Sequence, residues 1–519
     1  RAITCTLCIG DCGMAVGTVT SICTGVVRLT ITLLRTNRFT RYWVRQMMTT
    51  YKIMNHIRTK ELSKIGYTND QARSMALNIA SRHCKHSTRE EVLLQLMDVQ
   101  QNAAGYVGHP IWGPLASVFS PTVPEVGYTC PQLRADALPY HTVGGRHIEP
   151  AARRQMETAM SLPVTVAGAL MPDAHAGYGL PVGGVLATHN AVIPYAVGVD
   201  IGCRMALTII DEPASLLQRH GYEMKQVLKA ESHFGMEDDV PWRRQHAIID
   251  DERFAATALL RGLQRKAARQ LGTSGGGNHF AEWGTLQLND DNHLGLPGGA
   301  YAALLTHSGS RGLGATIADH YTRIATNVCR LPREARNLAW LDMDTDAGQE
   351  YWLSMQLAGD YVRACHEVLH HALLHAMGLK PLATVANHHN FAWQQSLADG
   401  TPAIVHRKGA TPAATGEPGI IPGSMATPAW LVTGRGHEAA LQSAAHGAGR
   451  AMSRRAATEK LTMSHLRHTL AAAGVTLVGG SVEEHPEAYK DIHQIMAAQQ
   501  ELVNCEGMFM PRIVRMNKE

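Results

Sequence analysis

Six short segments of this chain embed a polar residue that can bind a metal or a phosphate in a run of glycines or small apolar residues. They read MPDAHAGYG, VGVDIGCRM, TSGGGNHFAEWG, LTHSGSRGLG, VANHHNFAW and SAAHGAGRAMSR. Glycine destabilises an ordinary helix or strand, because it loses the most backbone freedom on folding, but it lets the backbone come close to a ligand. All six segments carry this loss of stability although they lie far apart in the sequence. We therefore predict that the fold brings them together around one ligand site.

The segment VGVDIGCRM sets an acid, Asp200, and a thiol, Cys203, three residues apart in an apolar stretch. A buried carboxylate is unfavourable unless it is paired or binds a metal, and a thiol binds metals once it is deprotonated. His279, His307 and His389 from three other segments add imidazoles, and the set suffices for two metal ions if the thiolate bridges them. Each histidine alone would more often be structural, but together these residues predict a metal site. On ligand type alone the metal would be zinc.

Composition places the chain among folded globular proteins. Of its 519 residues, 45% are hydrophobic and 18% are charged, and this length allows two or more domains. The net charge is only +4, so a nucleic-acid partner would have to be held by a local basic patch rather than by the whole surface. The 10 cysteines form no regular disulfide framework, which predicts a reducing compartment, and we expect the cytoplasm.

Residues 1–47 differ from the rest of the chain. They are apolar and rich in cysteine, but Asp11 and Arg28 interrupt them, so they make a poor membrane span and match only fragments of a signal peptide. The first cysteines lack a second CxxC pair, which argues against a zinc site there. We therefore expect a non-native or disordered leader and no membrane partner.

The remaining pattern predicts an α+β fold. Residues 48–130 read as a helical N-terminal extension and linker, with Asn69 and Ser87 as helix caps and a boundary near Cys130. Residues 131–519 read as one catalytic domain, in which short β-branched runs alternate with glycine turns and helical patterns. The expected strands include 163–172 and 191–202, and the expected helices cover 213–230, 252–270, 348–377 and 436–474.

The six segments form part of a longer series of motifs. Together with HRKGATPA (406–413), GIIPGSMATPAW (419–430) and PEAYKDI (486–492), they resemble the RtcB-type RNA ligases, also called tRNA-splicing ligases. The resemblance runs from Val143 or nearby to the C-terminus. For residues 131–519 it implies the RtcB-type fold, with mixed sheets and surrounding helices around a central metal cleft.

The resemblance also assigns roles to individual residues. It implies a site for two manganese ions, Mn²⁺, with Cys203 as the bridge, held by Asp200, Cys203, His279, His307 and His389. It implies that His446 of HGAGR is the catalytic residue that takes GMP from GTP. The positions that would hold the guanylate are Asn278, Glu282, Asn390, Gly423, Ser424, Met425, Gly447, Ala448 and Gly449.

The implied activity is that of a GTP- and Mn²⁺-dependent RNA ligase in RNA repair or tRNA splicing. Such an enzyme opens a 2′,3′-cyclic phosphate to a 3′-phosphate, activates that end with GMP through a histidine adduct, and joins it to a 5′-hydroxyl. Its partners would be RNA with these ends, GTP and, as in some relatives, an archease-type activator. Arg311, Arg407, Lys408 and Arg450 lie in or beside the motifs and would be either RNA phosphate contacts or surface residues.

Two alternatives belong to other functional classes. A metal-dependent phosphodiesterase or end-processing enzyme would keep the metal site but would need no His446. A non-catalytic RNA-binding paralogue would be expected to have lost metal ligands, and none of the predicted ligands is missing from this sequence. Catalysis is therefore the expectation.

The chain departs from the family pattern at several positions. Arg204 stands where the family has glycine, and would either reach toward a phosphate or disturb the turn. Cys365 and His366 replace an Asn-Arg pair, Ala429 replaces a serine near the guanylate, and Arg515 or Lys518 would stand for a final lysine. These changes suggest a divergent bacterial-type branch that repairs cleaved RNA.

Overall fold

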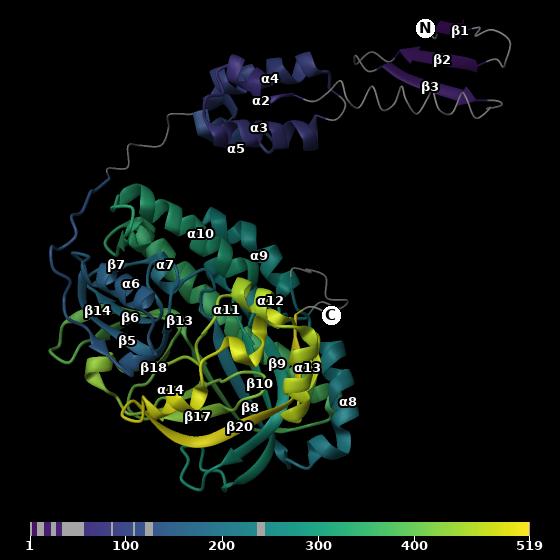
Figure 1. Cartoon of the computed structure of the whole chain (residues 1–519). Coiled ribbons are helices and arrows are strands. Elements are labelled where there is room, and N and C mark those ends of the chain that lie inside the picture. The colour runs from purple at the N-terminus through teal and green to yellow at the C-terminus, as the bar shows by residue number, and fades with distance from the viewer. Residues whose placement is uncertain are drawn as a thin grey trace. The chain divides into compact units, whose positions relative to one another are not determined.

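In the computed structural model, the chain divides into two compact units, Arg1–Val126 and Gly127–Glu519 (Figure 1). The residues that the structure describes are 3–7, 15–21, 27–33, 57–84, 87–106, 109–119, 128–235 and 244–517. Much of the expected leader, and Lys518, lie outside these residues.

Where it is described, the expected leader consists of strands. β1 (Ile3–Leu7), β2 (Ala15–Ser21) and β3 (Val27–Leu33) pair antiparallel in that order. Its non-native origin stays a prediction.

The predicted helical extension contains α2 (Thr59–Lys64), α3 (Asp70–His83), α4 (Arg89–Gln101) and α5 (Gly113–Phe119). Asn69 caps α3 as predicted, because its side chain accepts a hydrogen bond from the backbone N–H of Gln71. The prediction of Ser87 as the second cap is wrong by one residue. Thr88 caps α4: its side chain accepts from the N–H of Glu91, and the Glu91 side chain accepts from the N–H of Thr88, which completes a capping box.

A core of its own holds these helices together. The buried residues of α4, Val92, Leu96 and Val99, recur at helical spacing and pack with Leu62 and Leu115.

The second unit is built around two mixed sheets. The larger contains β8 (Arg204–Pro213), β9 (Phe280–Leu288), β10 (Gly299–Ser308), β12 (Pro381–His388), β16 (Pro418–Ile421), β17 (Ala429–Gly434), β19 (Thr476–Val478) and β20 (Val503–Met516). Its order is β12-β8-β10-β9-β20-β17-β16, and β19 pairs parallel to β20. Residues 205–210 of β8 are all buried because both faces of the strand are covered there: Leu207 and Ile209 join one core and Ile210 another.

The smaller sheet has the order β13-β14-β6-β5-β4. Its strands are β4 (His141–Thr142), β5 (Thr165–His175), β6 (Val182–Thr188), β13 (Asn390–Ser396) and β14 (Pro402–Lys408). Two short pairs accompany it, β7 (Ala191–Val192) with β11 (Leu341–Asp342), and β15 (Ala410–Pro412) with β18 (Ser443–Ala445).

Helices surround the sheets, as the α+β prediction requires. They are α6 (Pro150–Met160), α7 (Pro194–Val197), α8 (Leu216–Glu231), α9 (Ala258–Gln270), α10 (Arg311–Val328), α11 (Asp346–Met377), α12 (Arg454–Lys460), α13 (Met463–Ala472) and α14 (Ile492–Ala497). α11 packs against β8 and β10, and α10 contacts both α9 and α11 (Figure 1). In the described residues no helix is long and apolar enough to cross a bilayer.

The helices predicted over 213–230, 252–270 and 348–377 are confirmed as α8, α9 and α11, with shifted ends. The helix predicted over 436–474 is wrong in its first half, which forms β18 and a glycine turn, because pairing with β15 overrides the local helical pattern. The strand predicted over 191–202 is also mostly wrong. Pro194 begins the short α7, and Gly198 and Gly202 take positive φ angles of 98° and 72°.

Candidate functional site

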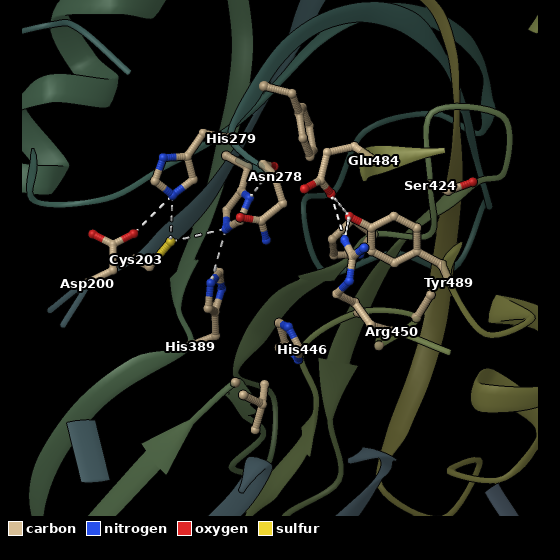
Figure 2. Close-up of a pocket in the computed structure, with 18 of the residues that line it drawn as sticks. Asp200, Cys203, Asn278, His279, His389, Ser424, His446, Arg450, Glu484 and Tyr489 are labelled. Carbon is tan, nitrogen blue, oxygen red and sulfur yellow. Dashed lines mark hydrogen bonds and ion pairs between the residues drawn. The ribbon is translucent and has the colours of Figure 1, made fainter. Parts of the chain in front are cut away.

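A cavity of about 380 Å³ opens in the second unit, between the two sheets' ends and the β18 turn. Its lining includes every residue that the sequence resemblance assigned to the metals, to GMP transfer and to the guanylate. Figure 2 shows His279, Cys203 and His389 turned toward one another, with His446 beside them. Residues that lie as far apart in the chain as Asp200 and Gly449 therefore share one cavity.

Backbone hydrogen bonds tie the Asp200–Cys203 turn to the corner between β12 and β13. The N–H of Gly202 donates to the carbonyl of Asn390 over 2.7 Å, and the N–H of His389 donates to the carbonyl of Cys203 over 3.0 Å. The turn closes with the N–H of Cys203 on the carbonyl of Asp200, at 3.2 Å. These bonds bring the acid, the thiol and His389 to one place.

Gly309 makes room for the acid. The Asp200 carboxylate lies where a Cβ of residue 309 would be, so any side chain there would overlap it. The next N–H, that of Ser310, donates to Asp200 Oδ1 over 3.1 Å. Gly309 of LTHSGSRGLG thus serves the close approach that the sequence predicts.

Four of the predicted metal ligands form a tight cluster around the sulfur. Cys203 Sγ lies 3.4 Å from His279 Nε2 and 3.1 Å from His307 Nε2. His307 Nε2 lies 3.2 Å from His389 Nε2. Asp200 extends the cluster, because its Oδ2 lies 3.0 Å from His279 Nε2.

The charge states of these side chains suit a cation. Burial, and next the neighbouring His279, lower the pKa of His307 to about 3. Its Nδ1–H donates to the carbonyl of Asn278 over 3.0 Å, so the lone pair of Nε2 faces the cluster. Burial, and next the Asp200 carboxylate, raise the pKa of the Cys203 thiol well above its ordinary value. A thiolate forms here only beside a positive charge, so the donor set fits a divalent transition-metal ion.

His446 follows β18 and is oriented by an aspartate. Its backbone N–H and its Nδ1–H both donate to Asp173 Oδ2, over 3.2 and 2.6 Å. Because a carboxylate can only accept, Nδ1 carries the proton and Nε2 keeps its lone pair. Gly409 leaves room for the ring, since a Cβ there would lie 3.2 Å from it. The ring of His446 is centred 5.3 Å from that of His389, which places this lone-pair nitrogen near the metal cluster.

Asp173 is a functional residue for which the sequence predicted no role. It lies on β5 and is completely buried. Its segment, MPDAHAGYG, is one of the six glycine-rich segments, but its partner His446 is 273 residues away, so no local pattern connects the two. The one feature of the sequence that could have indicated a role for Asp173 is that this acid lies in an apolar, glycine-containing segment.

The positions expected to hold the guanylate lie around the same cavity. Glu282 projects from β9, and burial raises its pKa well above the ordinary value, which favours a neutral carboxyl that can donate a hydrogen bond. The Asn390 side chain accepts from the N–H of Gly409 over 2.7 Å. Ser424 Oγ lies 2.9 Å from Thr427 Oγ1.

A second polar group borders the cavity on the side away from the cysteine (Figure 2). Arg450 Nη1 donates to Glu484 Oε2 over 3.1 Å, and the hydroxyl of Tyr489 donates to the same carboxylate. Arg454 Nε donates to Glu484 Oε1 over 3.4 Å. The group sets an aromatic ring and a guanidinium at the cavity wall.

Comparison with known proteins identifies the family. The family model described as tRNA-splicing ligase RtcB matches residues 155–247 and 212–516. The chain belongs to the RtcB family. It is 31% identical over 393 residues to the RNA-splicing ligase RtcB1 of Escherichia coli, a match that covers 69% of this chain and 92% of that protein.

Other RtcB proteins match at a similar level. The tRNA-splicing ligase RtcB of Nanoarchaeum equitans is 32% identical over 405 residues, covering 64% of this chain and 84% of that protein. The RNA-splicing ligase RtcB of Mycobacterium bovis is 30% identical over 417 residues, covering 66% and 95%.

The departures from the RtcB pattern fall in different places. Arg204 does not line the cavity; its Nη1 donates to His388 Nε2 over 3.1 Å, which excludes the predicted reach toward a phosphate there. His366 lies behind the site, with its Nδ1 2.7 Å from Thr306 Oγ1. Arg515 Nε donates to the carbonyl of Ser232, and its side chain is not part of the cavity lining.

The basic residues considered for RNA also separate. Lys408 and Arg450 line the cavity, and burial lowers the pKa of Lys408 to about 7. Arg311 is held by Thr273 Oγ1, to which its Nε donates over 2.9 Å. Arg407 is completely buried, so a contact with RNA phosphates is wrong for this residue.

Proposed function

We propose that this chain is an RNA ligase that uses GTP and Mn²⁺ to join 2′,3′-cyclic phosphate or 3′-phosphate ends to 5′-hydroxyl ends, through a GMP adduct of His446. The observation that carries the proposal is that His446, which lines the same cavity as the Cys203 cluster, is paired with the buried Asp173 behind it. The names of the relatives, RNA-splicing and tRNA-splicing ligases, support the class of reaction.

The metal ligands of the proposal are the five residues of the cluster. Two Mn²⁺ ions would be held by Asp200, Cys203, His279, His307 and His389, with the sulfur between two imidazoles as a bridge would require. When bound, the ions supply positive charge that neutralises the phosphates of GTP and RNA. Sulfur and imidazole donors suit zinc as well, so the identity of the metal needs its own measurement.

In the first step of the proposed reaction, His446 acts as the nucleophile. Its Nε2 lone pair attacks the α-phosphorus of GTP, the bond from that phosphorus to the bridging oxygen breaks, and pyrophosphate leaves. Asp173 keeps the proton on Nδ1 and stabilises the positive charge that develops on the ring. The residues around Asn278 and Ser424 would hold the guanylate while this bond forms.

The later steps act on RNA. Water opens a cyclic phosphate to a 3′-phosphate, one oxygen of which attacks the phosphorus of the adduct and releases the neutral imidazole of His446. The 5′-hydroxyl then attacks the 3′-phosphate, GMP leaves with the bonding electron pair, and a 3′,5′-phosphodiester remains. An archease-type activator and a cytoplasmic location stay predictions.

The variant His446→Ala tests the proposal. It should abolish covalent labelling by GTP carrying radioactive α-phosphorus, and all sealing of 3′-phosphate ends, because no other side chain provides this nucleophile. It should still seal RNA whose 3′ end already carries GMP, since that step does not use the histidine adduct.

Metal content is the control. His446→Ala should retain the metal of the unmodified protein, because His446 is not among the ligands. A variant that still became labelled, or that lost its metal, would show that His446 has another role. An unmodified protein that is never labelled but cleaves phosphodiesters would favour the metal-dependent phosphodiesterase.

A further inference from the structure

Within the described residues, Arg407 is a buried cation with no carboxylate in direct ion-pair contact; the charge of Glu417 acts on it only from a distance. Its side chain is completely buried on β14, and the described part of the chain contains no ion pair to it. Its guanidinium carbon lies 4.7 Å from the centre of the Trp393 ring, and its Nη1 has no hydrogen-bond partner in that part of the chain. Burial of a charge without a contacting carboxylate is unfavourable, so the hydrogen bonds of the guanidinium must offset that cost.

One further bond goes to β13, where Nη2 donates to Gln395 Oε1 over 3.2 Å, and the remaining bonds of Nη2 and Nε hold one turn. Nη2 donates to the carbonyl of Leu441 over 3.0 Å and to that of Gln442 over 3.3 Å. Nε donates to Ser443 Oγ over 2.8 Å. Five N–H groups in a planar fork allow arginine to hold three consecutive residues at once, which the single ammonium of lysine cannot do.

This turn has a strained backbone. Leu441 and Gln442 take φ angles of 50° and 48°, in the left-handed region that residues with a Cβ avoid. Two such residues in succession persist only where the surroundings hold them, and such strain gathers at functional sites. The hydrogen bonds from Arg407 help to stabilise this left-handed conformation.

The turn leads directly to the proposed nucleophile. Ser443 begins β18, whose last residue, Ala445, pairs with Ala410 of β15 and precedes His446. Gly409, which faces the His446 ring, follows Arg407 by two residues. β14 therefore holds the backbone before His446 with Arg407, and Gly409, directly after β14, lies against the His446 ring.

We infer that Arg407 is a positioning residue for GMP transfer: it holds the turn at residues 441 and 442 so that His446 meets Asp173 and its Nε2 faces the nucleotide. The inference rests on the proposed function of His446. Arg407 itself touches neither substrate nor metal, since it is absent from the cavity lining.

The variant Arg407→Lys keeps the charge and removes the fork. Because a displacement of about 1 Å costs up to about 100-fold in rate, labelling of His446 by GTP should slow by about tenfold to 100-fold, with little change in the GTP concentration for half-maximal rate. Sealing of RNA that already carries GMP on its 3′ end should stay within about twofold of the unmodified protein, because that step bypasses His446. An equal loss in both reactions, or no loss of labelling, would overturn the inference.

A matched control is Arg134→Lys. Arg134 also donates to backbone carbonyls, those of Pro163 and Thr165, over 2.9 and 3.1 Å, but does not line the cavity. This variant should leave the ratio of labelling to sealing unchanged. A shift in that ratio as large as the one in Arg407→Lys would show a general effect of stability and would overturn the inference.

Hydrogen exchange provides a readout that does not depend on the activity. In Arg407→Lys, backbone amides of residues 438–446 should exchange faster, as followed by mass spectrometry of the full chain, while the Arg134→Lys variant keeps them protected. Unchanged protection would overturn the inference even if the protein were never labelled by GTP. A different outcome is that GTP does not label the unmodified protein, while the amides still exchange faster in Arg407→Lys. That result would reject the proposed function, but it would support the role of Arg407 in holding the turn.

Discussion

At the scale of single residues, Cys203 links the side chains that we propose as metal ligands. Its sulfur contacts the imidazoles of both His279 and His307, and its carbonyl accepts from the N–H of His389. Burial raises the pKa of this thiol, so without a cation it is a neutral and inert group. The chemistry of the residue thus depends on the metal that it would bind.

We predict that Cys203→Ser lowers the metal content far more than Cys365→Ser. A hydroxyl that replaces a bridging thiolate removes a ligand from both ions, and loss of even an outer-shell partner costs about 10-fold to 100-fold in affinity, so about 100-fold is a minimum here. Cys365 is the control because it is buried in the main core, away from the cluster. Elemental analysis of the two purified variants measures their metal content. Equal metal content in both would contradict the bridging role of Cys203.

At the scale of elements, His406 fastens β14 to its neighbours. Its Nδ1–H donates to the carbonyl of Leu186 on β6 over 3.1 Å, and its Nε2 accepts from the N–H of Ile193 over 2.9 Å. Both bonds need the neutral ring with the proton on Nδ1. The position of β14, which carries Arg407 and Lys408, therefore depends on an uncharged histidine.

This histidine predicts a dependence of stability on pH. Burial lowers the pKa of His406 from 6.5 to about 4, so between these values the unfolded chain binds a proton that the folded chain does not. The free energy of unfolding contributed by this residue is complete above pH 6.5 and falls as the pH drops toward 4, by roughly 1.4 kcal/mol per pH unit.

His406→Gln keeps one donor and one acceptor but cannot titrate. Denaturant unfolding at pH 7, 6 and 5 should show a shallower loss of stability in this variant than in the unmodified protein. Identical slopes for the two proteins would mean that His406 does not contribute to the acid sensitivity.

At the scale of the whole molecule, the two units have separate cores. The helices of the first unit bury Leu62, Leu96 and their neighbours among themselves. The match to the RtcB family begins at residue 155, inside the second unit. All residues of the candidate site belong to that second unit.

We predict that a chain starting at Gly127 folds and is labelled by GTP at His446 at the rate of the full chain. The reason is that the cores that support the cavity consist of residues of the second unit alone. Thermal unfolding and the labelling assay on the shortened protein provide the measurement. Aggregation, or a slower labelling rate with the fold intact, would show that the first unit contributes to the second.

Local patterns in the sequence determined the helices and the identity of the site. The helical repeat of Val92, Leu96 and Val99 and the cap Asn69 act over a few residues, and the structure follows them. Asp200, Cys203 and the histidines could be chosen because a carboxylate, a thiol or an imidazole in an apolar or glycine-rich run is unfavourable unless it binds a partner there.

Only the tertiary structure decided burial and pairing. Arg407 reads as a surface contact for RNA because a charge normally stays in water, yet the elements around β14 bury it completely. The partner of His446 stands 273 residues away, and β18 exists because β15 lies beside it rather than because of its own residues. The burial of a side chain and the partner that it pairs with depend on which distant segments meet. The physical reason is that desolvation and hydrogen-bond geometry are properties of the packed chain and cannot be read from a local stretch of sequence.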